Sequence, residues 1–408
     1  MTRLTQSAAI ALAMLLAGCG AATPTPSTGA QTPLPVPTPT ATVSPAATPV
    51  PATPNAVPPT PVPSVAPPTP ATSAPPLASG PPPTPAIAEV VLLTHDSFAL
   101  SDAVIAAFHD QTGYTLKILR AGDAGVMVNQ AILSASHPLG DVLFGVDNTF
   151  LSRALNANIF EPYVANGLGG VPAEFQLDIA QHRVTPIDHG DVCVEVDGSV
   201  VPAQPAPKLA DLVKPAYKGR LIVESPATSS PGLAFMLATI ARFGETGSYT
   251  WLDYWRQLRD NDVQVSPSWD DAYDTQFSAG PGAGPRPMVV SYATDPAAQV
   301  DFADPPITEP SVYSLLDTCF SQVEFAGVLA GAKNPAGAQA FIDFLLSPAA
   351  QQDIPGQMYV YPVVPATPLP SSFQWAIEPV EQPLNVDPAA IEQNREHWID
   401  QWTTTVLR

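Results

Sequence analysis

Proline dominates residues 21–87 and sets the first limit on how this chain can fold. This segment holds 23 of the 51 prolines in the chain and contains no Asp, Glu, Lys or Arg. Proline lacks a backbone N–H and restricts φ, so a proline every two to four residues prevents helices and central strands. The segment also has few large apolar side chains to bury. We therefore predict an extended stalk, partly polyproline II, with a reach of up to ~200 Å at about 3.1 Å per residue.

Residues 88–408 are acidic and numerous enough to form a large core. All charged side chains except Arg3 fall here, so 15 Lys and Arg stand against 37 Asp and Glu, a net charge of −22. This balance argues against nucleic-acid binding, which depends on clustered Lys and Arg. A part of this size is expected to divide into two lobes. It contains no apolar run as long as the roughly 18 residues that a membrane-spanning helix needs, so we expect no such helix in it.

The N-terminal sequence MTRLTQSAAIALAMLLAGC (1–19) has the layout of an export signal. Arg3 precedes the apolar stretch Ala8–Ala17, which is too short for a stop-transfer helix. The sequence Leu16–Cys19 (LAGC) resembles a bacterial lipobox, in which cleavage before the cysteine leaves a thiol that carries diacylglycerol. The alternative is a plain signal peptide with an incidental cysteine. We predict a lipoprotein signal peptide over 1–18, a lipid anchor at Cys19, a stalk over 19–87, and an extracytoplasmic location at the cell membrane, in the periplasm or on the cell surface.

Strand and helix patterns alternate along residues 88–408 and predict an α/β fold in two lobes. Short apolar, β-branched runs indicate strands at 89–94, 115–119, 141–146, 220–224, 287–292 and 322–330. Amphipathic or long apolar runs with capping residues indicate helices at 101–111, 126–134, 149–156, 232–243, 249–259, 335–346 and 388–403. Strand–helix alternation favours a largely parallel sheet that is buried on both faces.

Two predicted helix starts carry groups that are suited to an anion. Ser229 and Ser230 lie between a strand and an apolar helix, just before Pro231, which suits a first helical turn. Hydroxyls and free N–H groups at a helix N-terminus can hold an anion, although simple N-capping is the more ordinary explanation for this segment alone. Asp123–Gly125 occupies the comparable place before another helix. The two starts would face each other across a cleft if the lobes are doubly wound.

Aromatic and acidic side chains also gather near the ends of predicted strands. They are Trp269, Tyr273, Tyr292, Tyr359, Asp96, Asp147 and Asp295. Most aromatic residues belong to a core, but carboxylates combined with aromatic rings are what an organic cation requires. The chain has no GxSxG, HExxH, Walker or CxxC motif, and its six histidines lack metal-ligand spacing. We therefore predict no catalytic residues and no metal site.

Two cysteines, Cys193 and Cys319, lie close to the predicted crossover between the lobes. In an exported protein two such thiols can form a disulfide, and the alternative is a pair of buried free thiols.

With these segments in order, the chain from about Val90 to Arg408 resembles the thiamine-binding component of bacterial ABC importers, a family of two-lobed substrate-binding proteins. One match to that family would be weak, whereas many collinear matches are specific. The segments that carry the resemblance are THDSF (94–98), GDAG (122–125), DVLFGVDN (141–148), TPIDHGD (185–191), ATSSPGLAF (227–235), SWDDAY (268–273), VVSYATDP (289–296), QVEFA (322–326), FLLSPAAQQDIP (344–355), MYVYPV (358–363) and REHWIDQW (395–402).

The resemblance implies an α/β, two-lobed periplasmic-binding-protein-like fold of type II, with a ligand cleft between the lobes. Lobe I is expected to comprise 88–190 and 323–408, and lobe II 191–322. The implied function is a solute-binding lipoprotein that captures thiamine, or thiamine mono- or diphosphate, and delivers it to an ABC permease. Such a protein is not an enzyme, uses no cofactor, touches the membrane only through its lipid anchor, and is expected to be a monomer.

The resemblance also assigns the ligand-binding residues. A ligand phosphate, when present, is held in that family by small residues, hydroxyls and a tryptophan, and these positions fall on Ala124, Gly125, Ser229, Ser230 and Trp269. The aminopyrimidine side falls on Tyr292, Ala293, Thr294, Asp295 and Pro296. The aromatic positions that flank the rings fall on His95 and Tyr359.

Several positions depart from the family pattern. A ring tyrosine becomes His95, a stacking tyrosine becomes Ala298, a tryptophan becomes Tyr359, a tyrosine near the crossover becomes His189, and Asp295 introduces an acid. The same fold could therefore bind another cation, such as a polyamine, ferric iron or another organic cation, although the Tyr-Tyr pair typical of iron binding is missing. A third alternative is a hydrolase or a thiamine-pyrimidine transferase that uses one of the two cleft-region cysteines as its nucleophile.

Overall fold

The computed structural model describes residues 88–377, 380 and 382–408, which all belong to one structural unit, Gly80–Arg408. The predicted signal peptide, the anchor at Cys19 and the stalk lie outside these residues. Among the helices of the described residues, none combines the length and the apolar character needed to cross a membrane.

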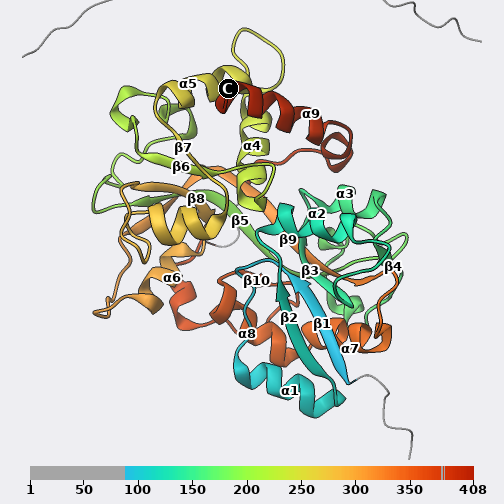
Figure 1. Ribbon diagram of the computed structural model, residues 1–408. Coiled ribbons are helices and arrows are strands. Elements are labelled where there is room, and N and C mark those ends of the chain that lie inside the picture. Colours follow the sequence, from blue (N-terminus) through green and yellow to red (C-terminus); the bar gives the residue numbers. More distant parts are fainter. Residues whose placement is uncertain (1–87, 378–379, 381) are drawn as a thin grey trace, which may run out of the picture. The chain divides into compact units, whose positions relative to one another are not determined.

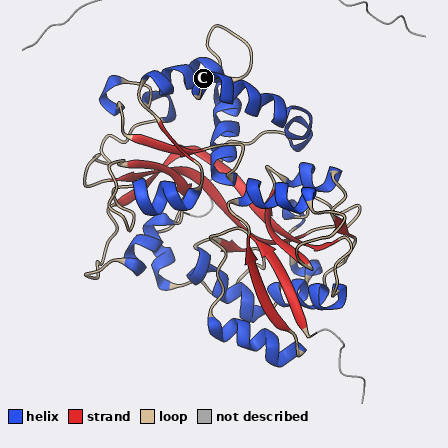
Figure 2. Cartoon of the chain, in the orientation of Figure 1, coloured by secondary structure: helices blue, strands red, loops and turns tan. Residues whose placement is uncertain are grey.

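Ten strands and nine α-helices are arranged along the described residues (Figures 1 and 2). The strands are β1 (Glu89–Thr94), β2 (Thr115–Arg120), β3 (Val142–Asp147), β4 (Phe160–Glu161), β5 (Thr185–Asp197), β6 (Leu221–Glu224), β7 (Gln264–Ser266), β8 (Met288–Tyr292), β9 (Val312–Leu329) and β10 (Tyr361–Pro362). The helices are α1 (Asp102–Thr112), α2 (Ala124–Leu133), α3 (Leu151–Asn156), α4 (Ser230–Phe243), α5 (Trp251–Asp260), α6 (Asp295–Phe302), α7 (Pro335–Leu345), α8 (Pro348–Met358) and α9 (Pro388–Val406).

All ten strands belong to a single mixed sheet, so the expectation of a largely parallel sheet is wrong. The main path of the sheet runs β2-β1-β3-β9-β5-β8-β6-β7. Strand β1 is parallel to β2 and β3, and β6 is parallel to β7 and β8. Strands β5 and β9 lie between these two parallel groups and pair antiparallel with each other. Strand β5 is also antiparallel to β8, and β9 is also antiparallel to β3. The βαβ pattern therefore describes each end of the sheet but not its centre.

Strand β5 and the first part of β9 escaped the sequence analysis because their composition is unusual for strands, whereas the predicted strand at 322–330 forms the rest of β9. Strand β5 reads TPIDHGDVCVEVD and contains a proline, a glycine and four acids. Strand β9 begins ten residues before the predicted position 322, in a stretch that includes Asp317 and several hydroxyl residues. Both strands are long. The pairing between them shifts register at two places in β5, between Pro186 and Asp188 and between Val192 and Val194.

The two ends of the sheet carry different helices and correspond to the two lobes. In Figure 1, α1, α7 and α8 lie around the end formed by β1 and β2, whereas α4 and α5 lie at the end formed by β6 and β7. The predicted boundaries at 190/191 and 322/323 fall inside β5 and β9, the strands that run between the two ends. The residue limits of the lobes stay a prediction.

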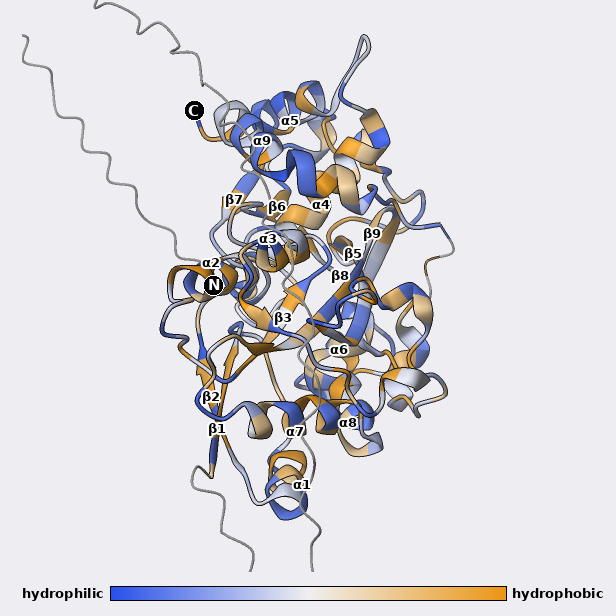
Figure 3. Ribbon diagram, turned by 90° about the vertical axis from the view of Figure 1, so that its right-hand side faces the viewer, coloured by the Kyte–Doolittle hydropathy of each residue, from blue (hydrophilic) through white to orange (hydrophobic). Residues whose placement is uncertain are grey.

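Lobe I has its own hydrophobic cluster around β1 and β3. Every residue of β3 is buried, and the strand is drawn largely in the orange of apolar residues in Figure 3. Phe108 of α1 packs edge-on against Phe341 and at a tilt against Phe344, both from α7, with ring centroids 5.2 and 5.3 Å apart. These contacts hold α1 against α7.

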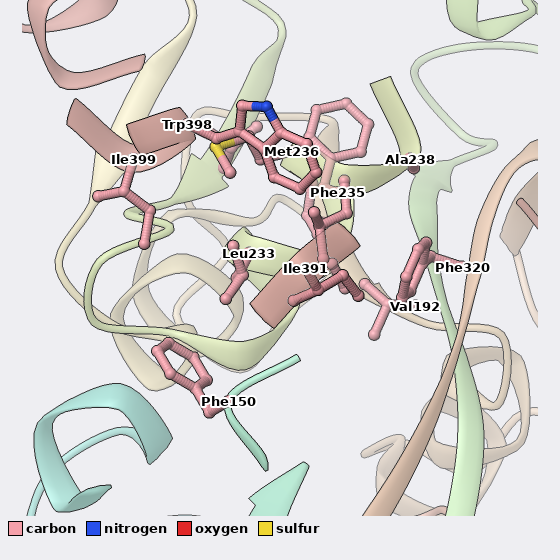
Figure 4. Packing of buried hydrophobic residues seen from close by; sticks show 14 of the residues in the cluster. Phe150, Val192, Leu233, Phe235, Met236, Ala238, Phe320, Ile391, Trp398 and Ile399 are labelled. Atoms are coloured by element: carbon pink, nitrogen blue, oxygen red, sulfur yellow. The ribbon is translucent and has the colours of Figure 1, made fainter. Parts of the chain in front are cut away.

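A second, larger cluster lies under α4, α5 and α9. Figure 4 shows Leu233 and Met236 of α4 in the same cluster as Trp398 and Ile399 of α9. Helix α9 contacts both lobes through polar groups as well. The Trp398 indole donates to Glu245 at 2.7 Å, and Asn156 of α3 donates to Glu392 at 2.9 Å.

Candidate ligand-binding site

A cavity of about 460 Å³ opens between residues of the two lobes. Lobe I contributes the loop after β1, the start of α2, Glu324 of β9 and residues 357–360 at the end of α8. Lobe II contributes the starts of α4 and α6 and the segment from Trp269 to Asp274, part of which is a short π-helix, Asp271–Gln276. A cavity of this size suits a small organic ligand.

Seven of the twelve residues predicted to bind ligand line this cavity. They are His95, Ala124, Ser230, Trp269, Tyr292, Asp295 and Tyr359. Five others do not appear in its lining: Gly125, Ser229, Ala293, Thr294 and Pro296. The roles of all twelve stay predictions.

The five remaining residues lie next to residues of the cavity lining. The Gly125 N–H donates to the carbonyl of Thr228 at 2.9 Å, and a side chain at Gly125 would collide with that carbonyl. Thr294 caps α6 and donates its hydroxyl to the carbonyl of Tyr359. Pro296 lies in the first turn of the same helix, and Ala293 packs beside the two cysteines.

At the start of α2, the carboxylate of Asp123 accepts two backbone hydrogen bonds. Its Oδ1 accepts from Ala124 N at 2.6 Å, and its Oδ2 accepts from Trp269 N of the other lobe at 2.9 Å. Burial raises the pKa of Asp123 to about 6, although these two N–H groups and the nearby Ser229 hydroxyl lower it. Asp123 is thus both the N-cap of α2 and a bridge between the lobes.

At the start of α4, two buried hydroxyls have no hydrogen-bond partner in the described part of the chain. These are Ser229 Oγ and Ser230 Oγ, and both residues are at most 2% exposed. Ser230 lies beside the buried Asp147, whose pKa is raised to about 6 by burial and lowered in part by the hydroxyls of Thr149 and Ser230. The hydroxyl-rich helix start predicted from the sequence is present, and it faces a carboxylate.

The lobe II wall of the cavity is aromatic. The Trp269 ring stacks on Tyr273 with centroids 4.9 Å apart and an interplanar angle of 13°. Its indole Nε1 donates to Ser291 Oγ at 3.0 Å, which holds the ring in place. Tyr292 meets Trp269 edge-on at 6.5 Å. Fixed rings of this kind present π faces to a cationic ligand.

Asp295 is a buried carboxyl group at the first residue of α6, and it faces the cavity. It is 4% exposed, and its Oδ2 has no hydrogen-bond partner among the described residues. Burial raises the pKa of Asp295 to about 8, although the Ser291 hydroxyl and the Tyr292 N–H lower it. Glu195 of β5 is also buried, and its pKa is raised by burial and by the charge of Asp295. Among the described residues, no Lys or Arg lies close enough to lower the pKa of either Asp295 or Glu195.

On the lobe I wall, His95 lies 3.7 Å from Glu324, measured from Nε2 to Oε1. Burial and the charge of Arg120 lower the pKa of His95 to about 4, so the ring is neutral near pH 7 and the contact is not an ion pair. Burial and the neighbouring Asp188 raise the pKa of Glu324.

The described cavity lining contains six carboxyl groups and no Lys or Arg. They belong to Asp96, Asp123, Asp270, Asp274, Asp295 and Glu324. No three His, Cys, Asp or Glu side chains of the described residues are grouped as a metal site would require. An organic cation with aromatic contacts fits this lining best.

Sequence reasoning missed some of these acids as site residues. Glu324 lies in the middle of the apolar run QVEFAGVL, and a charge inside such a run is a signal of function that we passed over. Asp270 and Asp274 gave no signal, because they lie in an acidic loop and only the tertiary structure brings them to the cavity.

Cys193 of β5 and Cys319 of β9 form a disulfide between the two central strands. Both residues are fully buried, in a small cluster with Ala293 and Val380. The disulfide therefore packs beside Ala293, two residues before Asp295 in the chain.

Three comparisons place this geometry among known proteins. The model of the family described as bacterial extracellular solute-binding protein matches residues 137–401. The thiamine-binding periplasmic protein of Salmonella typhimurium is 29% identical over 331 residues, which cover 79% of this chain and 96% of that protein. A solved periplasmic thiamin-binding protein aligns with a TM-score of 0.69 at 26% identity, covering 80% of this chain and 99% of the other.

Iron-bound HitA from Pseudomonas aeruginosa shares the fold, with a TM-score of 0.62 at 19% identity over 78% of this chain and 99% of HitA. The fold is accordingly that of the two-lobed type II periplasmic binding proteins, with the ligand cleft between the lobes, as predicted.

Proposed function

Because the chain belongs to the family of bacterial extracellular solute-binding proteins, we propose that it captures thiamine outside the cytoplasm and delivers it to an ABC permease. It performs no chemistry on the ligand. The proposal is supported most directly by one observation, an aromatic and acidic cavity in a chain whose relatives are named for thiamine binding.

The chemistry of thiamine matches the cavity walls. Its thiazolium ring carries a positive charge, which the carboxylates and the stacked Trp269 and Tyr273 would stabilise. Its aminopyrimidine carries an amino group, a donor for the unpartnered Oδ2 of Asp295. The neutral His95 and Tyr359 supply further ring surface on the opposite side.

Capture would occur by closure of the lobes around the ligand. In the structure, hydrogen bonds join the two lobes at the rim of the cavity. Ser97 Oγ of lobe I donates to Asp270 Oδ1 of lobe II at 2.7 Å, and Trp269 N donates to Asp123. These contacts would form only in the closed state that the permease recognises.

Lipid anchoring at Cys19 and the proline-rich stalk complete the proposal. Two or three acyl chains hold a protein stably at a membrane, and the stalk lets the binding unit reach ligand away from its surface. Incorporation of radiolabelled palmitate into the wild-type chain, and its loss in Cys19→Ala, would test this part.

Titration of tryptophan fluorescence with thiamine tests the function. We expect saturable quenching, because Trp269 lies in the cavity wall. Trp269→Phe should lose most of that signal, whereas Trp375→Phe, which removes a tryptophan outside the described cavity lining, should retain it. A protein that responds to no form of thiamine would disprove the proposal.

A polyamine is the second candidate ligand, since the carboxylates of the lining would equally suit spaced ammonium groups. Mass spectrometry of the ligand released when the purified protein is denatured separates the two. The transferase alternative loses its nucleophile, because Cys193 and Cys319 are both held in a disulfide.

A further inference from the structure

We propose that Phe302 is a further ligand-binding residue, which covers a ring of the bound ligand at the opening of the cavity and slows its release. The inference rests on the proposed function and adds a residue that the sequence analysis did not assign. Phe302 is the last residue of α6, and it lies outside the segments that carry the family resemblance.

The first observation is that Phe302 lines the cavity although most of the residue is open to solvent. It is 72% exposed, and among the exposed large apolar residues of the described chain it alone belongs to the cavity lining. A residue that lines a cavity and is also exposed lies at the opening of that cavity. Because a phenylalanine ring gains free energy when it leaves water, this ring has apolar surface that a ligand can cover.

The second observation is the spacing of the residues with which α6 lines the cavity. Asp295, Ala298 and Phe302 all belong to the lining and follow each other at intervals of three and four residues. This spacing places their side chains on one face of the helix. The buried carboxyl group lies at the start of this face and the ring at its end, with the small Ala298 between them. A ligand that pairs with Asp295 and extends along this face would reach Phe302.

The third observation is that α6 contacts Tyr359 of lobe I at both of its ends. The Thr294 hydroxyl donates to the carbonyl of Tyr359, and the Tyr359 hydroxyl donates to Asp301 Oδ2 at 3.1 Å. The rings of Phe302 and Tyr359 lie 5.3 Å apart at an interplanar angle of 57°. On Phe373 the Tyr359 ring is stacked, with centroids 6.2 Å apart. Two rings from different lobes therefore meet at the opening of the cavity.

This ring pair is expected to act on ligand release. The two rings meet only while the lobes are closed, so the pair is absent when a ligand first enters between open lobes. Once the lobes have closed, the π face of Phe302 attracts a cationic or flat ring beneath it. Loss of this ring should therefore raise the dissociation rate constant and leave the association rate constant nearly unchanged.

Stopped-flow tryptophan fluorescence of the full-length protein with thiamine measures both rate constants. In Phe302→Ala we expect thiamine to dissociate about tenfold faster, whereas association should stay within about twofold of the wild type. Phe302→Tyr keeps an aromatic ring, so its dissociation should stay within about threefold of the wild type. Asp301→Ala removes the acceptor of the Tyr359 hydroxyl and should accelerate dissociation less than Phe302→Ala does.

Leu133→Ala is the matched control, because it also removes an exposed apolar side chain. Leu133 is 86% exposed at the end of α2 and lies outside the described cavity lining. Both rate constants of this variant should stay within about twofold of the wild type. Thermal unfolding checks that each variant folds, and Phe302→Ala should keep a midpoint close to that of the wild type because the residue it truncates is largely exposed.

Two results would overturn the inference while leaving thiamine binding intact. One is a dissociation rate constant that does not change in Phe302→Ala. The other is slower association in Phe302→Ala with unchanged dissociation, since the ring would then act before the lobes close. A wild-type protein that gives no signal with thiamine, in this experiment and in calorimetry, would instead overturn the proposed function, and this inference with it.

Discussion

Two aspartates at helix starts face the same cavity from opposite lobes, and their carboxyl groups differ in their hydrogen-bond partners. Asp123 precedes α2 and has both oxygens hydrogen-bonded to backbone N–H groups. Asp295 begins α6 and has one buried oxygen without a partner among the described residues. Burial raises the pKa of Asp123 to about 6, and that of Asp295 to about 8.

The difference lies in what each carboxylate is available to bind. Asp123 stabilises the contact between the lobes and uses the N–H groups that an external anion would need. The Ser291 hydroxyl and the Tyr292 N–H offset only part of the effect of burial on Asp295, and its Oδ2 has no partner among the described residues, as expected of a group that binds a ligand. Two residues of one type in similar local sequence therefore serve opposite purposes.

The largest expected effect is on thiamine affinity, and it tests whether Asp295 binds the ligand. Asp295→Asn should weaken thiamine binding about 30-fold or more, because the variant removes a buried charge that pairs with the ligand. Isothermal titration at pH 7.5 measures the change. In the wild type, binding should also release a proton from Asp295, seen as a dependence of the enthalpy on the buffer used. Equal affinity of variant and wild type would mean that Asp295 has no direct role.

The next effect is on stability against pH. The pKa of Asp295 is higher in the folded than in the unfolded state, so its protonated form favours folding, and that stability is lost as pH rises through about 8. Lowering the pH from 8 to 6.5 should therefore raise the free energy of unfolding of the ligand-free protein by about 1–2 kcal/mol from this group alone. Asp188, whose pKa is raised to about 7, acts in the same direction.

Urea unfolding at pH 8 and pH 6.5 measures this change. Asp295→Asn should be more stable than the wild type at pH 8 and should show a smaller rise on acidification. A wild-type protein that becomes less stable between pH 8 and 6.5 would contradict the assignment of these buried acids.

The smallest effect concerns the hydroxyls of α4. Ser229→Ala should change the free energy of unfolding by less than about 1 kcal/mol and thiamine affinity by less than about threefold, because the hydroxyl has no hydrogen-bond partner in the described part of the chain. Ser291→Ala is the contrasting variant, since its hydroxyl accepts from Trp269 Nε1. It should weaken thiamine binding more than Ser229→Ala does. A strong loss of thiamine affinity in Ser229→Ala would place the ligand at α4 instead.

Much of the fold could be predicted because its outer elements follow local rules. Strand β1 begins and ends at the predicted residues, and α7 begins with the predicted Asn334 cap and proline. Strand β5 could not be found, since burial between neighbours allows Pro186 and Gly190 to lie within it. Seven predicted site residues reached the cavity, because motif matches preserve position even where the contacts differ.

The sequence by itself determined the separate proline-rich segment, the α/β character of the folded part and the acidic, aromatic chemistry of its site. These properties depend on composition and on patterns within a few residues. Only the tertiary structure decided that the central strands run antiparallel, that Trp269 N reaches Asp123, and that Asp295 Oδ2 has no partner among the described residues. These outcomes depend on which groups meet across long stretches of the chain, and on which donors remain once the backbone has satisfied its own hydrogen bonds.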